Sequence, residues 1–159
     1  MKFLRRHLIS FLFGALTILA LAEVFPVFTI GFWRIAYASE WAITSVGPVG
    51  GPAPDTLISS RIGAAPTASL SYRLLYLVGN AQGKAYAIIG LRSVDWTEYE
   101  RLRDEFALSA AHVRVHAGCI VDEWTAEDAI LFGEEVYWSE PLRDEKVKEL
   151  RAHFALLRK

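Results

Sequence analysis

The densest group of side chains that could do chemistry lies in the second half of the chain. His112 and His116 are close together, and Cys119, Asp122 and Glu123 follow them. Imidazole, thiolate and carboxylate groups are the ligands that transition metals take in proteins. A cysteine beside a histidine can also act as a nucleophile. This segment is therefore the first candidate for a metal site or a catalytic site.

The element that carries the two histidines decides whether they can act together. Residues 112–116 alternate between polar side chains and valine, which predicts a strand with Val113 and Val115 toward the core. On a strand, His112 and His116 lie roughly 13 Å apart, too far to share an ion whose bonds are about 2 Å long. We therefore expect no metal and no cofactor, and keep these histidines as the only metal candidates.

Other signatures of chemistry are missing from the sequence. Cys119 is the single cysteine, which excludes an intrachain disulfide and Cys-x-x-Cys chemistry, and we expect it to be buried as a small apolar residue. The segment 79–84 has the Gly and Lys of a phosphate-binding loop but lacks the following Ser or Thr. No motif orders the carboxylates between 122 and 135 as an acid–base pair. We therefore expect a protein that is not an enzyme.

Charge is distributed unevenly along the chain. From Arg34 to the end there are 14 basic and 17 acidic residues, and this net charge of −3 argues against nucleic-acid binding. No Lys or Arg lies between Arg114 and Arg143, whereas the C-terminal segment is basic. The acidic stretch predicts a partner-binding surface that includes Asp122, Glu123, Glu134 and Glu135. Two solvated faces of opposite charge, or self-association between them, explain the same pattern.

The N-terminus has the pattern of a membrane-targeting segment. Residues 1–7 form a basic region, and residues 8–33 are apolar except for Glu23 and a few small or polar positions. A helix over 8–33 rises about 39 Å, enough to cross a hydrocarbon core of roughly 30 Å. The basic residues that precede this segment predict a cytoplasmic N-terminus and an extracytoplasmic (periplasmic) C-terminal domain.

Two alternatives remain open for this segment. The small-x-small motif Ala20-Leu21-Ala22 is typical of a cleaved secretory signal. For an uncleaved transmembrane signal-anchor of the inner membrane, Glu23 is the notable residue, because a carboxylate in lipid commonly faces a protein partner. We then expect membrane lipid and other membrane protein subunits as partners.

Domain boundaries follow from composition. The dense Gly and Pro of 47–54 predict a linker over 34–54, which leaves 55–159 as a single domain. Within it we expect a β-hairpin formed by 69–78 and 84–92, a helix over 97–109 and the strand 112–116. A helix from Thr125 is expected to end at Gly133, before a short strand over 134–138 and a final helix from Pro141.

These elements predict the fold class and, by exclusion, the function. We expect an α+β protein in which an N-terminal transmembrane helix precedes a small antiparallel sheet with helices on one face. The leading functional hypothesis is a membrane-anchored accessory, assembly or interaction protein of an inner-membrane complex that acts through protein contacts. The alternatives are an exported enzyme or ligand-binding domain that uses the region of His112, His116 and Cys119, and an exported inhibitor or immunity-type protein with an acidic binding surface.

Overall fold

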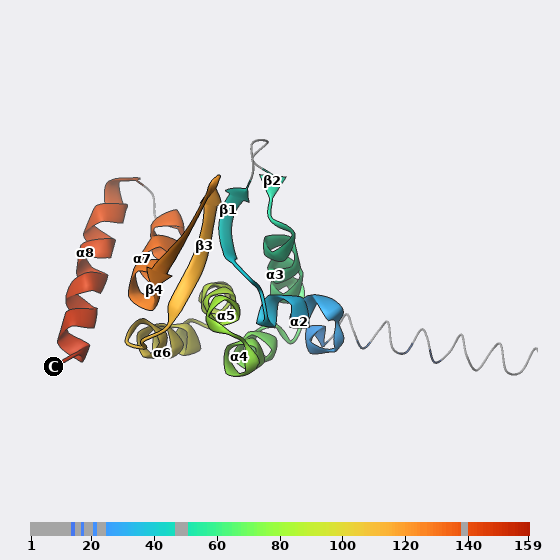
Figure 1. Cartoon of the computed structure of the whole chain (residues 1–159). Helices are drawn as coiled ribbons and strands as arrows, with labels where there is room; N and C mark the ends of the chain where they lie inside the picture. Colours follow the sequence, from blue (N-terminus) through green and yellow to red (C-terminus); the bar gives the residue numbers. More distant parts are fainter. Residues whose placement is uncertain (1–13, 15–16, 18–20, 22–24, 47–50, 138–139) are drawn as a thin grey trace, which may run out of the picture.

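A computed structural model describes residues 14, 17, 21, 25–46, 51–137 and 140–159 of the chain (Figure 1). Its helices are η1 (Pro26–Phe28, a 3-10 turn), α2 (Ile30–Ala36), α3 (Pro54–Ala64), α4 (Ala68–Val78), α5 (Ala81–Val94), α6 (Trp96–Ala107), α7 (Ala126–Tyr137) and α8 (Glu140–Leu157). Its strands are β1 (Trp41–Val46), β2 (Gly51–Pro52), β3 (His112–Gly118) and β4 (Ile120–Thr125). The protein is therefore α+β, as the sequence predicts.

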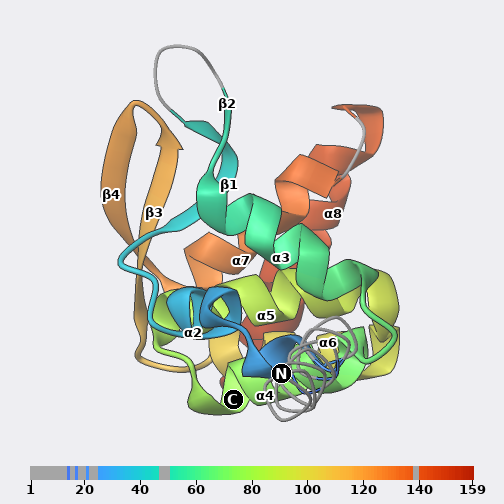
Figure 2. The ribbon, with the colours of Figure 1, turned by 90° about the vertical axis from the view of Figure 1, so that its right-hand side faces the viewer.

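The four strands form one mixed sheet in the order β2-β1-β3-β4. β1 lies parallel to β3, with Trp41 opposite Val115, whereas the β1–β2 and β3–β4 pairs are antiparallel. The prediction of an antiparallel sheet is wrong because it did not include β1. Figure 2 shows the β3–β4 hairpin at one side of the molecule, with β4 outermost, and the helices gathered on the other side.

The predicted transmembrane signal-anchor and the single-pass inner-membrane location are contradicted. Across the described residues, no helix has the length and the apolar character needed to cross a membrane. The end of the expected span instead belongs to the domain: after η1, the Thr29 side chain accepts a hydrogen bond from the Phe32 N–H at 3.2 Å and begins α2. Phe32 and Ile35 are fully buried in the core. Most of the residues before 25, Glu23 among them, lie outside the described residues.

The range 34–54, predicted as a linker, is also part of the folded domain. It contains the end of α2 and the strands β1 and β2, so it contributes to the sheet. The indole of Trp41 is almost completely buried. Residues 47–50, which hold part of the Gly/Pro run behind that prediction, are outside the described residues.

The β-hairpin predicted over 69–92 is wrong, because both halves are helices, α4 and α5. The Gly-rich segment between them begins α5: the Asn80 side chain accepts a hydrogen bond from the Gly83 N–H at 2.9 Å, as an N-cap does. The same residue joins α5 to the end of α2, since its backbone N–H donates to Ala36 O and its side-chain amide donates to Ala38 O, each at 2.8 Å. The residues that resemble a turn therefore form the start of α5, and this start packs against the end of α2.

The second half of the chain follows the sequence more closely. α6, β3 and α8 lie close to their expected ranges, and Val113 and Val115 are buried while His112 and Arg114 are exposed. Gly133 does not end α7, and the strand expected over 134–138 is wrong, because α7 continues to Tyr137. A Cβ at Gly133 would lie 2.9 Å from Ile89 and 3.0 Å from Trp41, so this glycine lets α7 approach α5 and β1 closely.

Asp95 joins α4 to the start of α6 and gives a pH-dependent prediction. It accepts hydrogen bonds from the Ser69 hydroxyl and the Arg73 guanidinium, both at 2.7 Å, and from the Glu98 N–H at 3.2 Å. The Ser69 hydrogen bond first, and then that of Arg73, lower the pKa of Asp95 from 3.8 to about 2. A lowered pKa in the folded state stabilises the protein above pH 3.8, and this contribution is lost as the pH falls through about 2.

We therefore expect Asp95→Asn to lower the melting temperature at neutral pH and to matter progressively less in acid. The difference in melting temperature between the two proteins shrinks as the pH approaches about 2, because the native carboxylate is then protonated as well. Scanning calorimetry over this range checks the prediction. A difference that stays constant with pH would show that the Asp95 charge contributes nothing.

Candidate functional site

The open edge of β4 is the main candidate for a contact surface. β3 and β4 are joined by a two-residue turn in which Gly118 has a φ of 64°, the conformation that a hairpin turn with glycine in first position requires. Ala117 therefore pairs with Ile120 through backbone hydrogen bonds, and the antiparallel alternation makes Asp122 and Trp124 the next bonded positions of β4. By the same alternation, the backbone groups of Val121 and Glu123 face away from β3.

Side chains at this edge combine apolar and acidic character. Ile120 is 69% exposed and Val121 is 40% exposed, and both Asp122 and Glu123 are exposed. The Asp122 carboxylate accepts hydrogen bonds from the Glu123 N–H at 2.8 Å and from the Trp124 indole at 3.3 Å. One outward backbone donor is thus covered by a side chain of the protein itself. Such covering is a common way to keep an edge strand from pairing indiscriminately.

A groove of about 370 Å³ continues this edge between β4, α7 and α8. Its apolar wall includes Trp124 and Phe132, whose rings meet edge to face with their centroids 4.9 Å apart. Acidic side chains line the same groove, and Arg151 of α8 is the one basic residue among the described residues that do so. The acidic residues are Glu123, Asp128 and Glu135. The groove is therefore an apolar trough with an acidic border.

The acidic residues around the groove differ in how far they are engaged. Glu127 forms an ion pair with Arg158 of α8. Asp128 and Thr125 cap the start of α7, because the Thr125 hydroxyl accepts from the Asp128 N–H at 3.2 Å and donates to its carboxylate at 2.8 Å. Part of the predicted acidic stretch thus has a structural role.

Glu134 does not belong to the acidic surface predicted from the sequence. It is 2% exposed, accepts a hydrogen bond from the Tyr99 hydroxyl and lies 3.3 Å from the guanidinium of Arg92. Burial first, and then the charge of Glu134, raise the pKa of the Tyr99 hydroxyl, so that it stays a proton donor. Glu134 therefore joins α7 to α5 and α6 inside the protein, whereas Glu135 is half-buried beside the groove.

The structure does not bring the candidate metal ligands together. His112 is exposed, while His116 pairs through Nδ1 with Glu40 at 2.9 Å, beside the Arg114–Glu40 pair at 3.7 Å. Cys119 lies exposed in the β3–β4 turn, so the expectation that it is buried is wrong. Among the described residues, no group of three potential ligands is placed to hold a metal ion. Glu23, the expected contact in the membrane, is outside the described residues.

Sequence reasoning missed β4 itself, although a signal for it was present. The Gly118-Cys119 pair has the glycine that a two-residue hairpin turn needs, and it follows a strand that was predicted. Acidic residues follow this pair, and their charge suggests a solvated surface and not a strand. Comparisons with known proteins add no assignment: no family model matches the chain, and no curated protein or solved structure matches it either.

Proposed function

We propose that this chain is a non-enzymatic interaction protein that binds an extended, basic segment of a partner polypeptide along the open edge of β4. The observation that carries the proposal is the outward direction of the backbone at Val121, at the edge of the sheet. Partner segments commonly add to such an edge as a further strand, through backbone hydrogen bonds.

The side chains beside that edge supply the specificity. An added strand would run past Glu123 and along the acidic border of the groove, where lysine or arginine side chains find opposite charge. Ile120 and Val121 offer exposed apolar area for alternate side chains of the same segment. A basic partner with alternating apolar residues therefore fits both features.

The rival functions have less support in the geometry. A site built on His112, His116 and Cys119 would need these groups to converge, whereas His116 pairs with Glu40 and Cys119 lies exposed in the hairpin turn. An inhibitor or immunity-type protein with an acidic surface would use the same β4 edge and is a special case of the proposal.

The experiment is a selection of random peptides displayed on phage against the full chain. We expect the enriched peptides to be rich in Lys or Arg and in β-branched residues, and their affinity to fall as salt is added. Glu123→Gln combined with Glu135→Gln should weaken their binding, because both carboxylates line the groove and neither caps a helix. Enriched peptides without a basic bias, or unaffected by these substitutions, would contradict the charge complementarity.

Val121→Pro tests the backbone contact alone. Proline removes the outward N–H of Val121 and leaves the hydrogen bonds between β3 and β4, so the fold should be preserved. We expect selected peptides to bind this variant roughly tenfold more weakly or worse, since a hydrogen bond and close strand approach are lost. The matched control is Val121→Thr, which keeps the N–H and the β-branched shape. Calorimetric titration of the three proteins measures the effect, and equal affinities would exclude pairing at β4.

A further inference from the structure

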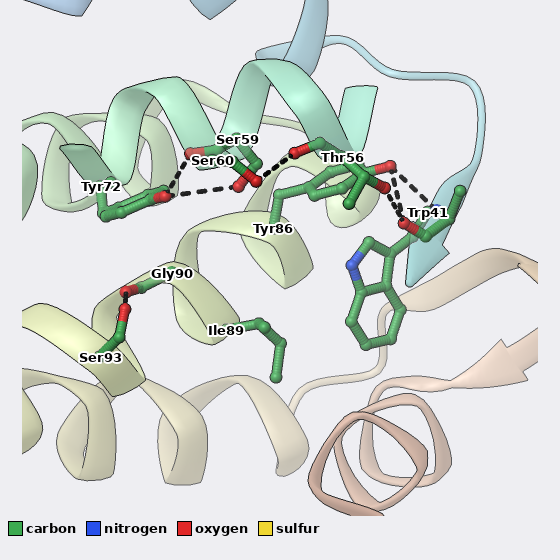
Figure 3. Close-up of a pocket in the computed structure, with 11 residues that line it drawn as sticks. Trp41, Thr56, Ser59, Ser60, Tyr72, Tyr86, Ile89, Gly90 and Ser93 are labelled. Carbon is green, nitrogen blue, oxygen red and sulfur yellow. Dashed lines mark hydrogen bonds between the residues drawn. The ribbon is translucent and has the colours of Figure 1, made fainter. Parts of the chain in front are cut away.

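A second, separate cavity of about 280 Å³ lies between β1, α3, α4 and α5 (Figure 3). It has room for roughly nine water molecules at about 30 Å³ each. No acidic or basic side chain is found among the described residues that line it, while hydroxyl groups approach it from α3, α4 and α5. Burying an unpaired charge is costly, so the cavity selects against charged molecules.

The hydroxyl groups at this cavity already donate hydrogen bonds to backbone carbonyl oxygens of the protein. Thr56 donates to Ala42 O at 2.7 Å, Tyr72 donates to Ser59 O at 2.6 Å, and Ser93 donates to Gly90 O at 3.0 Å. Figure 3 shows these bonds running to backbone carbonyls. The oxygens of Thr56 and Ser93 keep lone pairs, so the wall offers hydrogen-bond acceptors.

Tyr86 follows the same pattern at the β1 end. Its hydroxyl accepts from the Ala42 N–H at 2.9 Å and donates to Ala42 O at 3.4 Å. Burial raises the pKa of Tyr86 to about 12, which keeps the group protonated and neutral. The tyrosine thus fixes β1 against α5 and adds no charge to the cavity.

Trp41 supplies one donor that the protein leaves unused. Its side chain lines the cavity and the residue is only 1% exposed, yet no group of the described chain accepts a hydrogen bond from its indole N–H. In Figure 3 the indole nitrogen lies toward Tyr86, with no bond drawn to it. A bound molecule with an acceptor at this point would form a hydrogen bond that the described residues do not make.

From this pattern we infer that the cavity binds a small uncharged polyol, of the size of a monosaccharide. Its hydroxyls donate to the oxygens of Thr56 and Ser93, and one of its oxygens accepts from Trp41. A hydroxylated molecule suits the wall because each of its groups both donates and accepts. This inference does not depend on the function proposed for β4.

The test uses the full chain with a panel of neutral probes, namely glucose, galactose and myo-inositol, and the charged analogues gluconate and glucosamine. We expect at least one neutral probe to shift the NMR resonance of the Trp41 indole N–H, and the charged analogues to bind more weakly. If no neutral probe shifts this resonance at millimolar concentration, or if the charged analogues bind as well, the inference is overturned.

Two variants separate binding from folding. Trp41→Phe removes the donor and should weaken binding roughly three- to tenfold, whereas Trp33→Phe, at a residue of α2 that is 45% exposed and does not line the cavity, should not. Ser60→Leu, at an exposed position on α3 that lines the cavity, should fill its opening and abolish binding in a folded protein. Unchanged affinity in a folded Ser60→Leu variant would place the bound polyol elsewhere and overturn the inference.

Discussion

Replacing Glu134 by Ala is expected to lower the free energy of unfolding by about 3–5 kcal/mol, because it removes a buried carboxylate that faces a guanidinium and accepts a hydrogen bond from a tyrosine hydroxyl. The Arg92 side chain is 17% exposed and lies 3.3 Å from Glu134, and the Tyr99 hydroxyl donates to the same carboxylate. The alanine variant therefore removes a carboxylate that interacts with both groups. Denaturant unfolding followed by circular dichroism measures the change.

The adjacent Glu135 provides the matched control for this prediction. It is half-buried at the groove, and Glu135→Ala should change stability by no more than about 1 kcal/mol. Glu134→Gln should lie between the two, since it keeps an acceptor for Tyr99 and loses the charge that faces Arg92. If Glu134→Ala and Glu135→Ala are equally mild, Glu134 belongs to the acidic surface after all.

Gly83→Ala is the second substitution with a large expected effect. A Cβ at this position would lie 2.6 Å from Ala36 O and 3.0 Å from Ile35 O. Both contacts are backbone oxygens at the end of α2, so relief requires α5 to move away from α2. We expect a loss of about 1–3 kcal/mol or more, the usual range for overpacking, despite the better helix propensity of alanine.

Gly63→Ala is the control substitution, at a helical glycine outside the contact between α5 and α2. It lies in α3, where the nearest atom to an added Cβ is the Tyr72 hydroxyl at 3.1 Å, the end of a side chain. The change in stability should stay within about 1 kcal/mol, because helix propensity offsets the contact. Equal losses at the two glycines in thermal unfolding would contradict the close packing of α5 on α2.

The elements that the sequence predicts well share a clear period. Tyr99, Leu102 and Phe106 mark one face of α6 and are buried, and Phe154 is buried on α8. The alternation of β3 also places Val113 and Val115 correctly. In these elements one face is buried and the other is solvated, so the spacing of the apolar residues is enough to predict the element.

Elsewhere the same physical chemistry permits more than one structure. The apolar residues around Phe32 are equally suited to lipid and to a protein core, and tertiary packing in the domain decides for the core. For α4 and α5, the prediction of strands relied on Gly79 and Gly83, which are typical turn residues. In the structure both glycines instead allow close contact with the backbone of Ala36. β1 pairs with the distant strand β3, and Glu134 is buried by contacts with α5 and α6. Neither feature could be predicted from the local sequence.

The candidate sites, too, could be predicted only in part from the sequence. Charge counting located the acidic residues near β4, whereas the open edge depends on the register between β3 and β4. The hydroxyl-lined cavity had no signal in the sequence, because Thr56, Tyr72 and Ser93 are ordinary helix residues until their helices meet around Trp41. Sites assembled from several elements therefore needed the structure.

The most direct test of the β4 interface is amide hydrogen exchange measured residue by residue, with and without the tightest peptide from the selection. Pairing at the open edge predicts that the Val121 amide becomes protected in the complex, while amides on α4 keep their rates. If the peptide binds and the Val121 amide exchanges as fast as before, the partner does not add a strand to β4, and the proposed function is contradicted.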